Sequence, residues 1–439
     1  MKVLKPKLSF SSIINMNVGF FGLQYSFGLQ QTNMTPIYSF LGANPDDIPW
    51  LNLAGPMTGL IVQPIVGAIS DKTISKYGRR RPFFFIGAIL CSICLIAMPF
   101  SKNLWMAASL LWILDAANNL TMEPYRALIS DKLPVNQHSI GFLTQSFFTG
   151  LGITLANITP TILISLGLIN QNARSSNNIT YTTYAAFIIG AVVSISSIMY
   201  SLFKTKEAPL SKEEIIKIKS EPQNIFTVFK DIGIAIKEMP LQMKQLALVY
   251  FFTWYAMFIY WQFITLCLAK TIYNTSNPLS ENFANAQLLT GKINATYNIV
   301  TFCVAFLIAW VAKKISAKNV HAICLIFAGL GLMATTQIQN AGFLLFPMIG
   351  LGIGWASMMG TPYVILAGTI PKEKTGVYMG ILNMFIVLPM LIETISFKYV
   401  YKYLLNGNPV LAIKFAGFLI LIASVFVFRI KSVKSYFND

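Results

Sequence analysis

Five polar side chains capable of chemistry lie in one stretch that starts in a run apolar enough to cross a bilayer. The stretch covers residues 112–134, and these side chains are Asp115, Asn118, Asn119, Glu123 and Arg126. An ionisable group at mid-membrane costs about 2.5–3.5 kcal/mol on insertion scales, so it is by default a functional candidate. In a helix, Asp115 and Arg126 would be about three turns apart and would share a face with Asn119. Pro124 predicts a bend just before the arginine. The pattern is typical of a transport helix with a polar spine.

Uncharged polar and aromatic side chains recur on single faces of other apolar segments. Trp254 and Trp261 are seven residues apart, as are Tyr255 and Gln262. Amides donate and accept hydrogen bonds at once, which suits neutral polyhydroxy solutes, and Trp and Tyr rings suit the C–H face of a pyranose. For any single residue, hydrogen bonding between helices is the alternative interpretation. The candidates to hold a sugar are Gln24, Asn118, Asn119, Gln145, Tyr255, Trp261, Gln262 and Asn298.

Charges of both signs gather at two matching places, after the predicted second and fourth spans. Opposite charges there can pair across helices and close the cytoplasmic mouth of a cavity. A basic cluster that only sets the topology is the alternative. The candidate gate residues are Asp71, Arg79, Arg80, Arg81, Arg126 and Asp131.

The composition predicts a polytopic membrane protein. Of the 439 residues, 55% are hydrophobic and 11% charged, and the mean hydropathy is +0.61. Soluble domains carry about 25% charged residues. We expect no cleavable signal peptide, because the apolar run near the N-terminus lacks a small-residue cleavage site.

The net charge of +17 could suggest a nucleic-acid partner, but the positions of the charges argue against it. Most Lys and Arg residues fall in segments on the same side of the predicted membrane as the N-terminus. By the positive-inside rule this pattern places both termini in the cytoplasm, with the protein in the cell (inner) membrane.

The apolar segments predict twelve membrane-spanning helices. Each has about the twenty residues that a hydrocarbon core of ~30 Å requires. The predicted spans lie near residues 13–33, 50–70, 82–100, 104–125, 140–166, 181–203, 245–268, 287–312, 319–337, 343–368, 376–401 and 410–429.

A charged linker divides these spans into two sets of six. We predict an N-terminal half at 1–203, a cytoplasmic linker at 204–244 and a C-terminal half at 245–439. In the linker, Ser211-Lys-Glu-Glu214 has the pattern of a capping box and predicts the start of a short helix. Apolar residues at helical spacing then predict an amphipathic helix on the membrane surface, with a solvated linker as the alternative. They are Ile225, Val228, Phe229, Ile232 and Ile236.

The two halves resemble each other in sequence. Glu123-Pro-Tyr-Arg-Ala-Leu in the first half is echoed by Thr361-Pro-Tyr-Val-Ile-Leu in the second. Two joined repeats of six spans indicate a duplicated transporter whose site lies where the halves meet. The expected fold is therefore an all-α membrane protein of two pseudo-symmetric six-helix halves.

The sequence predicts no cofactor, no metal and no enzymatic activity. The five cysteines all fall in apolar runs, so disulfides are not expected. Cys91 and Cys94 have no nearby His or second Cys pair, which favours apolar packing over a metal site. The chain has no Gly-x-x-x-x-Gly-Lys-Ser/Thr loop, so we do not expect it to be an ATP-driven pump itself.

Two motifs resemble a known family. Gly55-Pro-Met-Thr-Gly-Leu-Ile-Val-Gln-Pro-Ile-Val-Gly-Ala-Ile-Ser-Asp71, followed by Gly78-Arg-Arg-Arg-Pro-Phe83, resembles the major facilitator superfamily. Trp112-Ile-Leu-Asp-Ala-Ala-Asn-Asn119 with Arg126-Ala-Leu128 resembles the fourth helix of the plant sucrose–proton symporters and their animal and bacterial relatives. The resemblance implies the facilitator fold, and it implies that Asp115 carries the proton.

Finer features of the resemblance bear on the substrate. Met122-Glu-Pro-Tyr-Arg126 and Gly376-Val-Tyr-Met-Gly-Ile-Leu-Asn383 are most similar to the bacterial branch, which takes up maltose, sucrose and similar glycosides. The chain departs from the family at Met390, where Gln is usual, and at Glu393, where a small apolar residue is usual.

We therefore expect a monomer in the lipid bilayer that imports a neutral glycoside, such as the disaccharide sucrose or maltose, with a proton. The first alternative is a multidrug or metabolite exporter on the same fold, which predicts a broad apolar cavity. The second is a membrane sensor or scaffold, which predicts a large domain outside the membrane.

Overall fold

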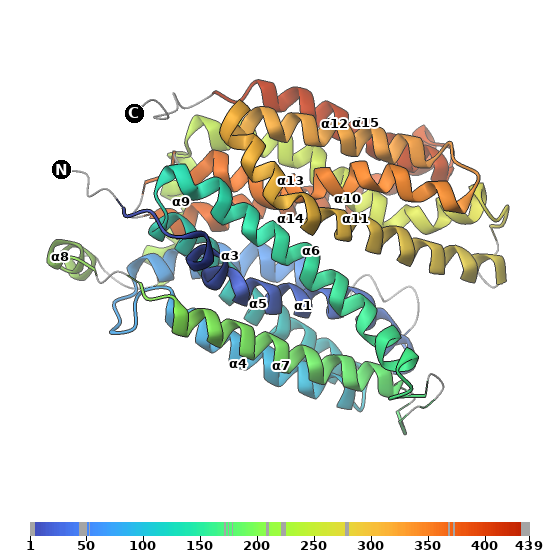
Figure 1. The fold of residues 1–439 in the computed structure, drawn as a ribbon, viewed down its shortest axis with the longest axis horizontal. Helices are drawn as coiled ribbons and strands as arrows, with labels where there is room; N and C mark the ends of the chain where they lie inside the picture. The colour runs from blue at the N-terminus through green and yellow to red at the C-terminus, as the bar shows by residue number, and fades with distance from the viewer. Residues whose placement is uncertain are drawn as a thin grey trace. The chain divides into compact units, whose positions relative to one another are not determined.

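The computed structural model describes residues 5–43, 51, 53–170, 173, 175–177, 179–207, 210–220, 225–276, 281–367, 369–371 and 374–431. These residues form helices joined by short connections and contain no β-strand, which confirms the all-α class (Figure 1).

The helices follow the predicted spans closely, although several start earlier or end later in the chain. The N-terminal part contains α1 (Phe10–Phe40), α3 (Ala54–Lys72), α4 (Arg81–Ala97), η2 (Met98–Phe100), α5 (Leu104–Lys132), α6 (Val135–Ser165) and α7 (Tyr181–Lys204). The predicted linker contains α8 (Lys212–Ser220) and α9 (Ile225–Lys237). The C-terminal part contains α10 (Leu241–Thr271), α11 (Glu281–Ile315), α12 (Ala317–Thr335), η3 (Ala341–Leu344), α13 (Leu345–Ala367), α14 (Thr375–Tyr399), the π-helical segment η5 (Val400–Leu404) and α15 (Pro409–Phe428).

Nine helices in the described part of the chain are long and apolar enough to cross a membrane. Helices α1, α3 and α5 are not among them, and these three carry many of the buried polar side chains described below. The helices thus support a multi-pass membrane protein, and the count of twelve spans stays a prediction.

The chain forms two compact units. The first unit contains residues 1–141, 151–238 and 370–384, and the second contains 142–150, 239–369 and 385–439. Each unit therefore includes a short segment from the other part of the sequence, one from α6 and one at the start of α14. The predicted boundaries of the linker between the N-terminal and C-terminal halves, at residues 204 and 244, stay a prediction.

The same pattern of helix packing occurs in both units. In the first unit, α5 packs on α1, α3 and α4, while α7 packs on α1 and α4 (Figure 1). In the second unit, α13 packs on α10, α11 and α12, while α15 packs on α10 and α12 (Figure 1). In chain order these helices correspond one to one, as two copies of one bundle would.

Helix α5 is held by contacts at its start and at Tyr125. The side chain of Asn103 accepts a hydrogen bond from the Met106 N–H at 2.9 Å and caps the first turn. The helix continues through Pro124. The Tyr125 hydroxyl donates to the Met16 carbonyl at 2.5 Å, and its ring stacks on Phe84 with centroids 4.7 Å apart. These contacts fix the rotation of α5 against α1 and α4.

The two linker helices agree with their sequence signals. Ser211 and Glu214 form the capping box, since the Ser211 N–H donates to Glu214 Oε2 at 2.7 Å and the Glu214 N–H to Ser211 Oγ at 3.1 Å. Helix α9 packs on α3, and Asp231 pairs with Lys72 at 2.5 Å. Phe226 and Phe229 are exposed, so an apolar face is left open, while the side chains of Ile225 and Val228 lie outside the described residues. Its place on the membrane surface stays a prediction.

Candidate functional site

Asp115 lies in the interior of the first unit, where 3% of its surface is exposed. Gln30 of α1 is within hydrogen-bonding reach, and a Cβ added to Gly55 of α3 would lie 3.6 Å from Asp115 Oδ2. Tyr38 and Cys91 are its other electrostatic neighbours. None of the ion pairs recorded between described residues includes Asp115. Asp115 is therefore a buried carboxyl group with neutral neighbours.

The two asparagines of α5 connect that helix to its neighbours. Asn118 Nδ2 donates to Ser26 Oγ of α1 at 3.1 Å. Asn119 Oδ1 accepts from Gln63 Nε2 of α3 at 2.5 Å, and its Nδ2 donates to Thr58 Oγ1 at 3.0 Å. Asn118 Oδ1 and Gln63 Oε1 are buried without a hydrogen-bond partner among the described residues. Such acceptors have unused capacity to bind a hydroxyl group.

No hydrogen bond recorded between described residues links Gln24 of α1 to this amide network. Gln24 is buried, and a Cβ added to Gly152 of α6 would lie 3.0 Å from its Cβ. The structure thus places Gln24, Asn118 and Asn119 in the first unit together with Asp115, and their contact with a sugar stays a prediction.

Arg126 has different neighbours from those predicted for a gate residue. Its Nη1 donates to Asn383 Oδ1 and lies 3.5 Å from Glu123 Oε1. Asn383 Nδ2 in turn donates to Glu123 Oε1. The neutral amide of Asn383, at the start of α14, therefore bridges the two charges of α5.

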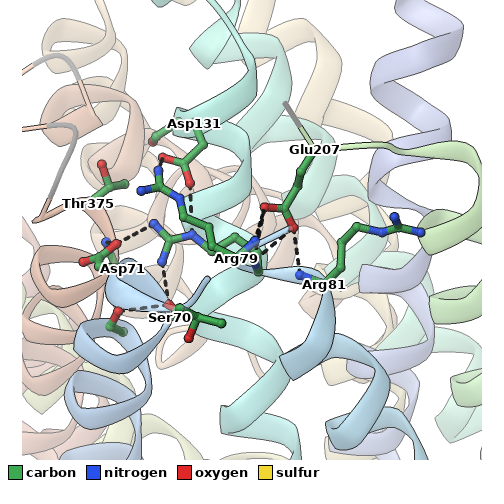
Figure 2. Close-up of polar contacts among 12 residues, drawn as sticks. Ser70, Asp71, Arg79, Arg81, Asp131, Glu207 and Thr375 are labelled. Carbon is green, nitrogen blue, oxygen red and sulfur yellow. Dashed lines mark hydrogen bonds and ion pairs between the residues drawn. The ribbon is translucent and has the colours of Figure 1, made fainter. Parts of the chain in front are cut away.

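Four of the predicted gate residues meet in one group of charges in the first unit (Figure 2). Arg80 lies 2.5 Å from Asp71 and 3.0 Å from Asp131, measured between nitrogen and oxygen atoms. Arg79 lies 2.8 Å from Asp131, and Arg80 Nη1 donates to Ser70 Oγ at 2.5 Å. We call Ser70, Asp71, Arg79, Arg80 and Asp131 the arginine cluster. It ties α3 and the turn before α4 to the end of α5.

Asp71 also caps the start of α14. Its Oδ1 accepts the Gly376 N–H and its Oδ2 accepts the Val377 N–H, both at 3.0 Å. The unpaired N–H groups and the dipole of a helix N-terminus favour a carboxylate at this position. Only glycine allows this approach, because a Cβ at Gly376 would lie 2.5 Å from the Gly67 carbonyl oxygen. The arginine cluster thus includes an attachment point for α14.

The guanidinium group of Arg80 is fully buried between two carboxylates. Burial by itself would lower the pKa of Arg80, but the charges of Asp131 and Asp71 outweigh it and raise that pKa above its ordinary value. Arg80 therefore keeps its charge throughout the physiological pH range.

Arg81 lies beside the arginine cluster and not in it. Its Nη2 donates to the Leu202 carbonyl at 2.7 Å. Glu207, which the sequence did not single out, accepts the backbone N–H groups of Arg79, Arg80 and Arg81 at 2.9, 3.0 and 2.8 Å (Figure 2). It thereby satisfies N–H groups that the start of α4 leaves free.

The second unit contains an aromatic group that we call the tryptophan cluster, made of Trp254, Trp261, Trp355 and Tyr297. The ring centroids of its neighbouring pairs are 5.6 to 6.4 Å apart, mostly edge to face or tilted. The Tyr297 hydroxyl is within hydrogen-bonding reach of Trp261 and Asn298. Trp355 Nε1 is buried without a hydrogen-bond partner among the described residues, so this donor is available to a ligand.

The remaining sugar candidates also lie in the second unit. Gln262 Nε2 donates to Glu393 Oε2 at 3.1 Å, and the hydroxyls of Tyr255 and Ser396 are 2.8 Å apart. Glu393 is fully buried. Gln145 and Asn298 are buried as well, each with one side-chain amide atom that has no partner among the described residues. These positions agree with a polar lining, and the ligand-binding role of each residue stays a prediction.

Sequence reasoning missed several of the partners. Asn383 ends a motif noted for its family resemblance, but no local pattern predicted the contacts of Asn383 or Trp355, because these form only when helices distant in sequence pack together. Glu207 lies in the charged linker, where local sequence did not distinguish it from the other charged residues. The echo of the Pro-Tyr motif between α5 and α13 was the one clue to the surroundings of Trp355. In the described part of the chain, no group of three His, Cys, Asp or Glu side chains could hold a metal ion.

The chain belongs to the major facilitator superfamily, since the model of that family matches residues 16–392. It is a family of membrane transporters, and this membership confirms the predictions that the protein spans the membrane several times and that it is not an enzyme.

The individual relatives share low sequence identity with this chain. The chain is 23% identical over 431 residues to the sucrose transport protein SUT5 of Oryza sativa subsp. indica, covering 85% of this chain and 79% of that one. It is similar in structure to the proton:xylose symporter XylE, with a TM-score of 0.65, 13% identity and coverage of 96% and 95%. The transporter FucP in its outward conformation gives a TM-score of 0.71 at 13% identity, with coverage of 97% and 99%. These solved structures support the facilitator fold.

Proposed function

We propose that this protein imports a neutral glycoside, most simply a disaccharide such as sucrose or maltose, together with a proton. Transport would follow alternating access between two six-helix halves, with twelve spans and both termini in the cytoplasm of a cell whose inner membrane it occupies. Its similarity to a plant sucrose transport protein supports the substrate class.

The observation that carries the proposal is Asp115 itself. It is a buried carboxyl group in a long interior helix, with Gln30 within hydrogen-bonding reach, neutral neighbours on α3 and α4, and no recorded ion pair among the described residues. A structural carboxylate at such depth would be expected to pair with a cation. A group that must gain and lose a proton in each cycle needs the environment that Asp115 has.

The neutral side chains around the interior support a sugar rather than an ion as the other substrate. Amide and indole groups offer unused donors and acceptors in both units, at Asn118, Gln145, Asn298 and Trp355. Sugar hydroxyls donate and accept, and the ring faces of the tryptophan cluster suit the apolar face of a pyranose. A glycoside offers both hydroxyl groups for such amides and an apolar ring face for such aromatic side chains.

Proton coupling supplies enough free energy for the task. One proton that moves down a membrane potential of ~100 mV releases about 2.3 kcal/mol. That amount concentrates a neutral sugar on the order of fifty-fold, because each 1.4 kcal/mol is a factor of ten.

A direct test is uptake of radiolabelled glycosides by the purified protein in proteoliposomes, with and without an inward proton gradient. We expect one or a few disaccharides to accumulate only when the gradient is present. Competition of this uptake by unlabelled glycosides of increasing size would then define the substrate. If no sugar is taken up and the vesicles instead transport apolar cations, the exporter alternative is correct and the proposal is wrong.

A further inference from the structure

A second acidic residue lies on the same face of α5 as Asp115. Asp115, Asn119 and Glu123 are each four residues apart, so they form one line along the helix. Glu123 is about 12 Å from Asp115 along the axis, toward the end that carries the arginine cluster. It has none of its surface exposed.

The two oxygens of the Glu123 carboxyl group differ. Oε1 accepts from Asn383 and lies 3.5 Å from Arg126 Nη1. Oε2 is buried without a hydrogen-bond partner among the described residues. One oxygen of the carboxyl group therefore contacts Asn383 and Arg126, and the other is able to accept a proton.

The charges around Glu123 are few. On α5 itself, Arg126 is the charged neighbour, and from α14 the facing group is the neutral amide of Asn383. No charged side chain of α1, α3 or α4 is recorded beside it within the described residues. A proton on Glu123 would therefore remove the negative charge that this carboxyl group places beside Arg126.

We propose that Glu123 is a second proton-binding residue, which receives the transported proton after Asp115 and holds it before release at the arginine-cluster end. The inference rests on the proposed proton coupling. In the step, Asp115 loses its proton and becomes a carboxylate, and the Glu123 carboxylate gains that proton on Oε2, through water, so charge and atoms balance. Protonation removes the counter-charge of Arg126 and weakens the hold of Glu123 on Asn383. The location of the proton thus changes the contact between Glu123 and Asn383 of α14.

The test measures sugar-evoked currents from proteoliposomes adsorbed on a solid-supported membrane, with sugar exchange as a parallel measurement. Wild-type protein should give a transient followed by a steady current. Glu123→Gln should keep the transient and the exchange, because Asp115 can still load, and should lose at least nine-tenths of the steady current. Glu123→Asp, which keeps a carboxyl group, should restore part of it.

The repeat provides a matched control, since Thr361 stands in α13 where Glu123 stands in α5. Thr361→Val should leave the steady current unchanged. An unchanged steady current in Glu123→Gln overturns the relay, and so does loss of exchange together with the current, because that pattern assigns Glu123 a structural part. If wild-type protein transports no sugar at all, the proposed function fails instead.

Discussion

The two units share one packing pattern and differ in what they bury. Every ion pair recorded between described side chains lies in the first unit. The second unit contains the tryptophan cluster instead, with Trp254, Trp355 and Tyr297 buried and Trp261 half-buried. At the repeated Pro-Tyr motif, the positions of Asp115 and Arg126 in α5 correspond to Ile353 and Val364 in α13.

Under the proposed function, this difference is a partial division of labour between the two units. The charged groups that would couple transport to protons lie in the first unit and the aromatic rings that would face a sugar lie in the second, while amide side chains occur in both. The motif tyrosine keeps its packing role in both, since Tyr125 and Tyr363 are each buried and each stack on a phenylalanine. Packing residues were thus retained where the chemistry diverged.

The largest effect should follow Asp115→Asn, which removes the proton site of the first unit while keeping its size. Proton-driven accumulation, on the order of fifty-fold in the wild type, should disappear. Downhill exchange of preloaded sugar should persist, because the second unit is untouched. Uptake and counterflow in proteoliposomes measure both. Robust accumulation by this variant would remove Asp115 from the mechanism and the coupling role from the first unit.

A smaller effect is expected from Asp71→Asn, which breaks the attachment of α14 to the arginine cluster. The loss of a hydrogen-bonded charge costs about 1.5–3 kcal/mol, enough to shift the protein toward the inward-open state. Spin-label distances across the cytoplasmic face should lengthen.

The matched control for Asp71→Asn is Glu238→Gln. Glu238 and Lys374 form an exposed pair at 3.1 Å. Such surface pairs contribute only about 0–1 kcal/mol, so the spin-label distances in Glu238→Gln should match those of the wild type. Unchanged distances in Asp71→Asn would show that the arginine cluster does not stabilise one conformational state by holding α14.

A smaller change again should come from Trp261→Ala in the second unit. Loss of an aromatic contact of about 0.5–1.5 kcal/mol should raise the KM for sugar up to roughly ten-fold. The dependence of uptake on the proton gradient should stay the same. Trp310→Ala is the control, because Trp310 is exposed and stacks with Lys314. A change in proton coupling without a change in KM would contradict the division between the units.

The smallest effect is expected from Glu393→Gln, which tests whether the second unit, whose described residues form no recorded ion pair, also takes no part in proton chemistry. The amide can still bond to Gln262, so we expect a change of about 1 kcal/mol at most in apparent sugar affinity. If Glu393 titrates during transport, the pH profile of uptake will also shift. An unchanged profile would leave Glu393 as a purely structural acceptor.

Local patterns in the sequence predicted most of the fold. Apolar spans, the capping box at Ser211 and the repeated Pro-Tyr motif each depend on neighbours in the chain, and the helices follow them. The buried polar residues of α5 were also predictable, because a charge inside an apolar run is conspicuous. The tertiary partners were not. Arg126 could be placed on the correct helix face, but its contact with Asn383 depends on how α14 docks, which no local pattern encodes.

The exchange of short segments between the units has a consequence for the order of synthesis. Residues 370–384 complete the first unit, although they are made long after residue 238. Until they leave the ribosome, the Asp71 carboxylate has no α14 amides to accept and Glu123 has no Asn383. Until then, the two carboxylates keep their arginine partners but lack their hydrogen bonds to α14. Docking of α14 is a late event of biogenesis, and it joins the earliest-made helices to nearly the last.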